Sequence, residues 1–299
     1  MTENEPSPGE TTPDAGTTGT DRSTPADQTV DSDSSRRVRR VMGRELRTVA
    51  RTRTFAALGV AFAAILIATA WVGGGVRAGF VPAVVDLLTP LELLVPVVTV
   101  AFGYRAIVGD RERGELDVLT TYPVTARELV LGIYAGRAVG VLVVVVVPLL
   151  LVGAAGFVVQ TDPTGRYASH VGADSPILFA RFVVLTALFA LVVLAVVLAM
   201  SALVDGARSA LALALGGLVV LLVGLDLAIA YGFASNYVGD GSLVYTLAIS
   251  PLSAYRGLVF ETVVLTAAGT GPQAASPIAS LFGLVVWAVV SLLVAVKTL

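Results

Sequence analysis

Cysteine is absent from this 299-residue chain, and histidine and lysine each occur once. The lack of cysteine excludes disulfides, thiolate catalysis and cysteine-based metal sites. His170 has no second histidine with which to bind a metal or relay a proton. Lys297 does not lie in the G-x-x-x-x-G-K-[ST] pattern of a nucleotide-binding loop. We therefore expect no cofactor, metal or nucleotide on this chain, so any ATP hydrolysis must occur on another polypeptide.

Charged residues are also scarce. They make up 14% of the chain, whereas hydrophobic residues make up 56%, and the mean hydropathy is +0.84. A soluble core of this length cannot bury so much apolar surface, so the composition predicts an integral membrane protein. The hydrolase patterns H-E-x-x-H and G-x-S-x-G are missing as well. A membrane-embedded enzyme is therefore the weaker alternative, and we expect the chain not to be an enzyme.

The first 35 residues contain eight acids and one arginine, with almost no large aliphatic side chains. Such a segment cannot bury enough surface to offset its chain entropy, which predicts a disordered acidic tail over 1–35. It also lacks the apolar core of a signal peptide. Arginine supplies 19 of the 20 basic residues, a composition typical of a GC-rich, halophilic source.

The charge then reverses, because eight arginines fall between positions 36 and 53 with aliphatic residues at helical spacing between them. This pattern predicts a basic amphipathic helix over 36–54 on an anionic membrane surface. An arginine-rich arm can also bind nucleic acid, but the interleaved aliphatics and the adjoining apolar run favour the membrane. The arginines expected to meet lipid are Arg40, Arg44, Arg47 and Arg51.

Six apolar runs are long enough to span a bilayer at a rise of about 1.5 Å per residue. Fourteen basic residues fall on one side of these runs and four on the other, so the positive-inside rule predicts that both termini face the cytoplasm. The sequence thus predicts an all-α polytopic protein of the plasma membrane. The runs cover about 55–72, 90–108, 137–159, 177–204, 209–231 and 277–296.

A charged segment, residues 109–128, separates the second and third runs. Asp110 can cap a short helix that carries Leu116 and Leu119 three residues apart, and Pro123 ends that helix. The sequence from Thr125 to Glu128 then fits the S/T-x-x-E capping box, which predicts the start of a much longer helix. We interpret this segment as the part of the chain that meets water and a partner.

The same segment carries a family resemblance. Residues 103–119, followed by Tyr122-Pro123-Val124, resemble the E-x-E-x-G-T-L-x-x-L-L-x-x-P signature of ABC-2 type permeases. Within that family, the chain is most similar to the subgroup containing the permease of the nitrous-oxide-reductase maturation transporter. Asp110 and Glu115 stand where the family commonly has Glu and Thr, and Ile133 stands where it often has Lys. The order of segments agrees over 36–299.

The resemblance implies that 36–54 is an elbow helix and that 109–128 is a coupling helix docked into a separate ATPase subunit, which binds the ATP and Mg. It also implies an assembly of two permeases and two ATPases. A merely solvated loop is the competing interpretation of 109–128. The candidate coupling residues are Asp110, Glu112, Gly114, Glu115, Leu116, Leu119 and Pro123.

For residues 232–276, the resemblance implies short re-entrant helices on the outer side, with a turn at Ser250-Pro251-Leu252. A seventh span here would bury Arg256 and Glu261 near the bilayer centre. That burial costs ~2.5–3.5 kcal/mol for the arginine alone, so we expect six spans.

A tandem GxxxG pattern formed by Gly132, Gly136 and Gly140 predicts close helix packing, within one subunit rather than between subunits. Ionisable residues inside the apolar runs are Glu92, Arg181 and Asp226, which the run boundaries place towards the outer ends. Interfacial placement or a local ion pair explains them as well as substrate contact does.

The sequence therefore predicts the permease subunit of an ABC-2 type exporter, driven by a separate ATPase. The alternative is a membrane protein that does not use ATP, either a secondary carrier or a scaffold. A carrier would lack its usual coupling group, because no carboxylate or histidine is expected at mid-membrane depth.

Overall fold

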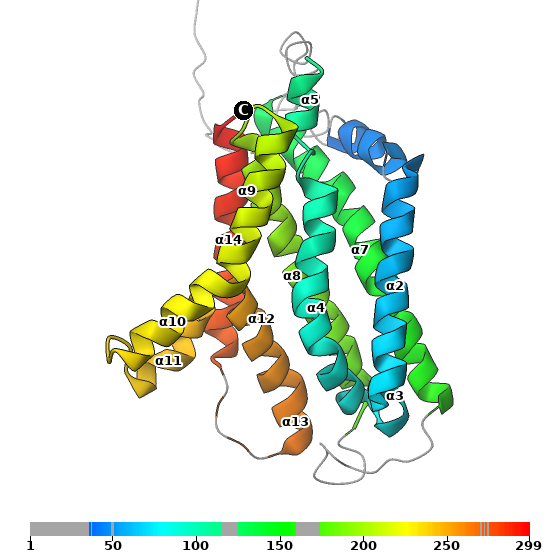
Figure 1. Cartoon of the computed structure of the whole chain (residues 1–299), viewed down its shortest axis with the longest axis vertical. Coiled ribbons are helices and arrows are strands. Elements are labelled where there is room, and N and C mark those ends of the chain that lie inside the picture. The colour runs from blue at the N-terminus through cyan, green and yellow to red at the C-terminus, as the bar shows by residue number, and fades with distance from the viewer. Residues whose placement is uncertain are drawn as a thin grey trace, which may run out of the picture.

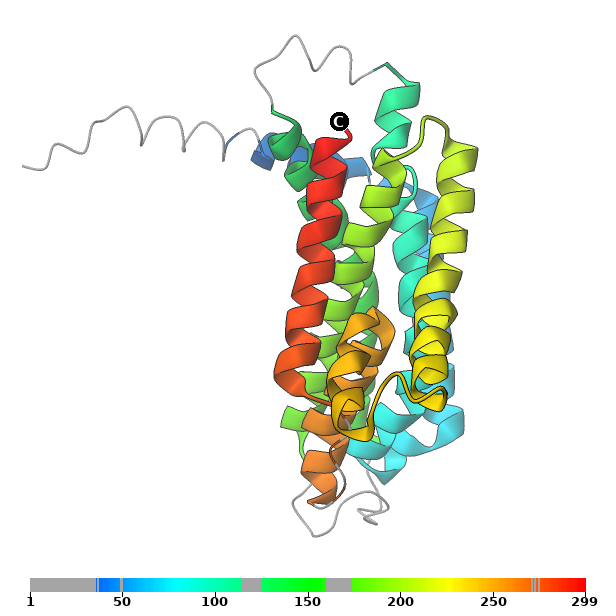
Figure 2. The same cartoon turned by 90° about the vertical axis from the view of Figure 1, so that its left-hand side faces the viewer.

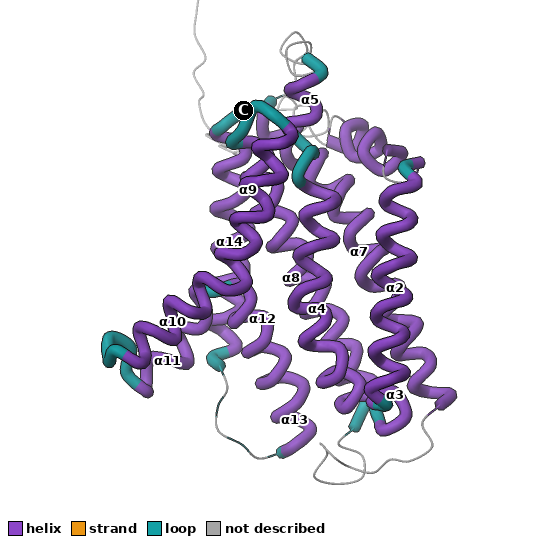
Figure 3. The backbone as a smooth tube through the Cα atoms, viewed as in Figure 1, coloured by secondary structure: helices purple, strands orange, loops and turns teal. Residues whose placement is uncertain are grey.

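The computed structural model describes residues 36, 38–48, 51–114, 125–159, 174–269, 271, 273 and 275–299. These ranges are largely helical and contain no β-strand (Figure 3), which confirms the predicted all-α class. The predicted acidic tail, His170 and residues 115–124 lie outside the described residues.

Six helical segments of the described chain are long and apolar enough to cross a membrane, which confirms the predicted number of spans. They run side by side for most of their length (Figures 1 and 2). The segments are α2 (Arg53–Gly73), α4 (Phe80–Gly103), α7 (Ala126–Val159), α8 (Pro176–Ala202), the joined helices α9 (Ala207–Val219), η1 (Val220–Gly224) and α10 (Leu225–Ala234), and α14 (Pro277–Lys297).

Local sequence explains where several helices begin. Three of them, α8, α12 (Pro251–Val259) and α14, start at a Ser-Pro pair, in which the serine side chain accepts a backbone hydrogen bond and proline occupies the first helical position. The predicted capping box before α7 is confirmed. The Thr125 backbone N–H donates to Glu128 Oε2 at 2.9 Å, and the Glu128 N–H donates to Thr125 Oγ1 at 3.3 Å.

The second span begins earlier than the sequence analysis predicted. The short helix α3 (Gly75–Ala78) follows α2, and α4 then starts at Phe80 and continues through Pro90 and Pro96. The prediction took Pro90 as a boundary because proline is costly inside a helix. Asp86 lies inside α4, and its carboxylate accepts a hydrogen bond from the Gly75 N–H at 2.9 Å. Glu92 consequently lies halfway along α4, not towards its outer end.

The fifth span contains a π-helical segment, η1, and Figure 1 shows α10 and α11 (Asp240–Thr246) projecting from the side of the bundle. The chain continues through η2 (Leu247–Ile249) and Ser250, and then returns as α12, η3 (Phe260–Val264) and α13 (Leu265–Ala268). Helix α12 packs against α8 and α14. Each described element of this region is short, and none of them is a candidate span.

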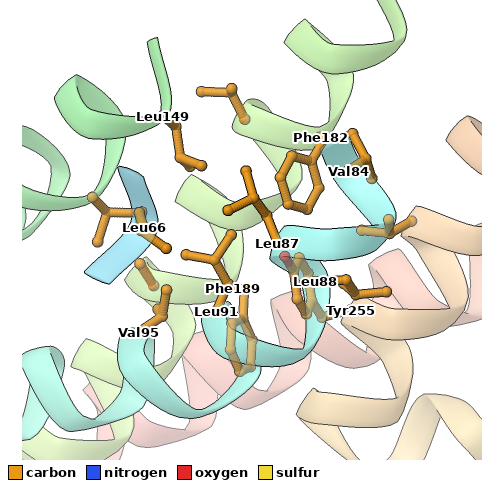
Figure 4. Packing of buried hydrophobic residues seen from close by; sticks show 14 of the residues in the cluster. Leu66, Val84, Leu87, Leu88, Leu91, Val95, Leu149, Phe182, Phe189 and Tyr255 are labelled. Carbon is orange, nitrogen blue, oxygen red and sulfur yellow. The ribbon is translucent and has the colours of Figure 1, made fainter. Parts of the chain in front are cut away.

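Helix α8 lies at the centre of the bundle and is the most buried span, in contact with α4, α7 and α14. The apolar core in Figure 4 joins α4 and α8 to α2, α7 and α12. The core also contains a polar contact between side chains, because the Tyr255 hydroxyl and Thr186 Oγ1 are 2.9 Å apart. The Tyr255 ring stacks on Phe189 at 4.6 Å, so α12 is an integral part of this core.

The two ends of the bundle differ. One end, called the α5 end here, carries α5 (Val108–Glu112), the carboxyl terminus and the helix over residues 38–48 (Figure 1). The opposite end carries α3 and α13. The helix over 38–48, called the N-terminal helix here, lies across the bundle beside the upper end of α2.

Candidate functional site

Helix α5 is fixed to the bundle from its first turn. The backbone N–H groups of Ile107 and Val108 both donate to Ser201 Oγ of α8, each at 3.2 Å. These N–H groups are among those that a helix start leaves without intrahelical partners. Because Ser201 is fully buried, the start of α5 is anchored inside the bundle and does not lie loosely on its surface.

The sequence predicted Asp110 as a helix cap, and the structure shows that this prediction is wrong. Ile107 is the N-cap of α5, and Asp110 lies within the helix with its side chain buried. Its carboxylate accepts a 2.7 Å hydrogen bond from Arg44 of the N-terminal helix and a second one from Arg113. A buried carboxylate requires such partners, because desolvation penalises an unpaired charge.

A second buried carboxylate extends this network. Glu45 pairs with Arg44 at 3.2 Å and accepts a 2.8 Å hydrogen bond from Arg137 Nε of α7. Arg137 also donates to the Phe102 carbonyl at the end of α4, at 3.1 Å. Asp110, Arg44, Glu45, Arg113 and Arg137 form what we call the charged network. It connects α5, the N-terminal helix, α4 and α7.

The opposite side of α5 holds the loop between α8 and α9 and the carboxyl terminus. Arg111 donates to the carbonyls of Ala202 and Val204 at 3.1 and 2.8 Å, and to the Thr298 carbonyl at 3.5 Å. Glu112 accepts a 2.6 Å hydrogen bond from the backbone N–H of Ala207, where α9 begins. A displacement of α5 would therefore act on several spans at once.

The other predicted coupling residues divide into two groups. Gly114 follows α5 with φ of 68°, a left-handed conformation that glycine adopts without strain, and its N–H donates to the Arg111 carbonyl. Gly114 therefore ends the helix. The remaining predicted coupling residues lie outside the described residues: Glu115, Leu116, Leu119 and Pro123.

The glycine face of α7 receives the N-terminal helix of the same chain. Gly132 faces Val41 and the Val38 carbonyl, and Gly136 faces Glu45 and the Met42 carbonyl. A Cβ atom on either glycine would overlap these groups, so the close approach depends on glycine. Gly140, one turn further on, is also buried. The apolar face of the N-terminal helix is thus turned to α7, while Arg40, Arg44, Arg47 and Arg51 are exposed.

The structure forms a further charged pair at mid-height in the bundle. Arg256 of α12 binds Glu92 through two hydrogen bonds, from Nε to Oε1 at 2.7 Å and from Nη2 to Oε2. Glu92 is buried, whereas the Arg256 side chain is 44% exposed. The cost of burying Arg256 and Glu261 was the reason to expect no seventh span, and for Arg256 the bidentate pair with Glu92 offsets that cost.

The other two ionisable residues singled out in the spans also bind the segment from α12 to η3. The Ser253 hydroxyl of α12 donates to Asp226 of α10 at 2.8 Å, and Arg181 donates to the Thr262 carbonyl of η3 at 3.2 Å. Their partners lie in α12 and η3, which are in contact with each other. The pairs therefore hold the segment from α12 to η3 against the bundle.

Two members of the charged network, Glu45 and Arg137, were not recognised as functional candidates from the sequence. Glu45 is the one acid among the eight arginines of positions 36–53 and shares a helical face with Val38, Val41 and Met42. An acid on an apolar face is a signal for a buried partner. Arg137 directly follows Gly136, within the tandem GxxxG pattern, and this position was a second available signal.

Comparison with known proteins identifies the family of the chain. The family model described as ABC-2 family transporter protein matches residues 39–298. The "Probable ABC transporter permease protein NosY" of Pseudomonas aeruginosa is 31% identical over 234 residues, covering 76% of this chain and 82% of the relative. The protein of the same name from Stutzerimonas stutzeri is 29% identical over 220 residues, covering 71% and 77%. The chain therefore belongs to the ABC-2 family of transporter proteins and is a permease subunit of an ABC transporter.

Proposed function

We propose that this permease works as an exporter in the plasma membrane, driven by a separate ATPase subunit that docks at the α5 end. Both termini and the α5 end then face the cytoplasm, as the excess of arginine there favours. The chain pairs with a second permease, either an identical copy or a related protein, and the pair assembles with two ATPase subunits, which bind the ATP and Mg. Membership of the ABC-2 family supports an ATPase partner.

The attachment of α5 is the observation that carries this proposal. Its residues contact α8, the loop before α9, the carboxyl terminus and, through the charged network, α4, α7 and the N-terminal helix. In the proposed mechanism, ATP-driven closure of the ATPase pair pushes on 109–128, and these contacts transmit the force to the spans. ATP acts by favouring one of two arrangements of the assembly.

Leu116 and Leu119 are proposed to insert into a groove on the ATPase, because they are apolar residues three apart in a charged segment. The variant Leu116→Asp with Leu119→Asp should lose the ATPase on co-purification and lose stimulation of its activity. Truncating buried interface anchors typically costs about 1–4 kcal/mol of binding free energy. Arg208→Asp is the matched control, since it adds an exposed acid at the same end but outside 109–128. Wild-type recovery and stimulation of the ATPase with the double variant would refute this role.

The position of Glu92 raises the second candidate function, a secondary carrier. Glu92 lies halfway along α4, which supplies the mid-membrane carboxylate that the sequence analysis did not expect. Its two oxygens are both held by Arg256, however, so the carboxylate is neutralised within the chain. An ion-coupled carrier needs a carboxylate that exchanges its partner during transport. The pairing of Glu92 and the family membership both favour the ATP-driven permease.

A further inference from the structure

A cavity of about 600 Å³ lies at the α5 end between the N-terminal helix, α2, α4 and α7. This volume is within the range of about 300–1,000 Å³ that is usual for small-molecule sites. The cavity shares Arg113 with the segment 109–128 on which the ATPase is proposed to act, and its lining combines two kinds of surface.

One part of the lining is basic. Arg44, Arg105 and Arg113 have exposed fractions of 42%, 53% and 58%, whereas Arg137 lies deeper at 12%. Among the described residues that line the cavity, Glu45 is the one acid, and it is held by Arg44 and Arg137. The pair between Arg105 and Glu112 is long, at 3.4 Å, so this guanidinium can turn towards a stronger acceptor. The basic part therefore favours an anion with several oxygen acceptors.

The other part of the lining is apolar. Phe55 and Leu58 of α2 face it together with Ala101 and Phe102 of α4, and the rings of Phe55 and Phe102 stack at 4.3 Å. Helix α2 is the least buried of the six spans, and its other faces carry exposed aliphatic side chains. The cavity therefore lies beside a helix that faces the hydrocarbon of the bilayer, at the level where the spans begin.

We propose that this cavity binds one anionic phospholipid, with the phosphate among Arg44, Arg105 and Arg113 and the start of an acyl chain against Phe55 and Leu58. Basic pockets between membrane helices are suited to such headgroups. A free phosphate would satisfy the arginines but would leave the apolar wall unused, so the lipid is the better fit. The lipid site itself does not depend on the proposed topology. That topology determines only which leaflet supplies the lipid, and it would be the inner leaflet.

Lipid bound in this cavity would also affect the attachment of α5. Arg44 and Arg113 hold the buried Asp110 carboxylate, so a phosphate that draws these guanidiniums into the cavity competes with that carboxylate. Lipid occupancy thereby regulates how firmly α5 is tied to the N-terminal helix. Non-specific attraction to a charged membrane surface would have no such effect.

The test uses the full-length chain, purified in a neutral detergent, freed of lipid and titrated with phosphatidylglycerol while native mass spectrometry counts the bound molecules. We expect one tightly held phosphatidylglycerol per chain, with phosphatidylcholine bound much more weakly. Arg105→Gln should weaken phosphatidylglycerol binding about fivefold, as one lost arginine contact predicts. Leu58→Trp, which fills the apolar part and keeps every charge, should weaken it as well.

Arg47→Gln is the matched control, because it removes an exposed arginine of the N-terminal helix that does not line this cavity. Equal losses with Arg47→Gln and Arg105→Gln would overturn the site and leave only surface attraction. Equal binding of the two lipids, or displacement of phosphatidylglycerol by inorganic phosphate at the same concentration, would overturn the anionic lipid as its ligand. No ATPase is present, so these outcomes do not bear on the proposed coupling.

Discussion

At the scale of single residues, Glu92 and Arg256 show how charge is kept inside an apolar bundle. Each of these residues alone would be expensive at mid-membrane depth, but together they form a bidentate pair that satisfies both carboxylate oxygens. The pair joins residues 164 positions apart and fixes α12 against α4. Its value to the fold lies in avoiding an unpaired buried carboxylate.

The first prediction follows from that pairing. Arg256→Leu leaves Glu92 buried without its partner and should lower the free energy of unfolding by about 1–3 kcal/mol. The double variant Glu92→Leu with Arg256→Leu should recover most of this loss, because replacing both members of a pair with apolar groups is often nearly neutral. Thermal unfolding of the purified chain in one detergent measures both effects. A double variant less stable than Arg256→Leu would contradict the pairing account.

Residues that interact locally could be predicted, whereas distant pairs could not. The capping box of Thr125 and Glu128 follows from a spacing of three residues and a known hydrogen-bond pattern. Glu45 and Arg137 are 92 positions apart, and nothing in the spacing of a single sequence reports that they meet. The charged network therefore became visible only when the N-terminal helix was seen to cross α7.

At the scale of elements, the contact between the N-terminal helix and α7 depends on glycine. Gly132 and Gly136 leave room for Val41 and Glu45, so the helix approaches closely enough for Glu45 to reach Arg137. A larger residue at either glycine would move the N-terminal helix away from α7. The same movement would separate Glu45 from Arg137. Packing and the charged network are thus coupled at this crossing.

The second prediction tests this crossing. Gly136→Ala places a methyl group against Glu45 and the Met42 carbonyl, and overpacking of this kind typically costs about 1–3 kcal/mol. Gly216→Ala in α9 is the control, because nothing lies within 4 Å of its added methyl group. The control should be neutral or stabilising by up to about 1 kcal/mol, since alanine favours the helix. Equal thermal stability of the two variants would show that the glycine contact is not tight.

Helix number was easier to predict than helix boundaries. The six apolar runs identified the six candidate spans, because length and hydrophobicity are strong signals. The predicted second run started at about Pro90, whereas α4 continues through that proline and through Asp86, whose carboxylate accepts a hydrogen bond from Gly75. A local tertiary contact of this kind overrides residue propensity.

At the scale of the whole molecule, the structure divides into a charged end and an apolar bundle. Helix α5 and the charged network gather at one end, while α12 and α13 reach into the bundle from the other (Figure 1). In the proposed mechanism, the ATPase acts on the first end and the transported molecule leaves past the second. Both assignments depend on which end faces the cytoplasm.

Accessibility of single cysteines tests this orientation most directly, and the absence of native cysteine makes the experiment clean. Ser242→Cys lies in α11, Thr298→Cys at the end of α14, and Thr120→Cys in the segment proposed to bind the ATPase. An impermeant thiol reagent applied to intact cells should label position 242 and spare positions 120 and 298, and all three should react after permeabilisation. Labelling at 298 in intact cells would contradict the proposed topology of six spans with cytoplasmic termini. Labelling at 120 would place the proposed coupling segment outside the cell, where no ATPase could drive it.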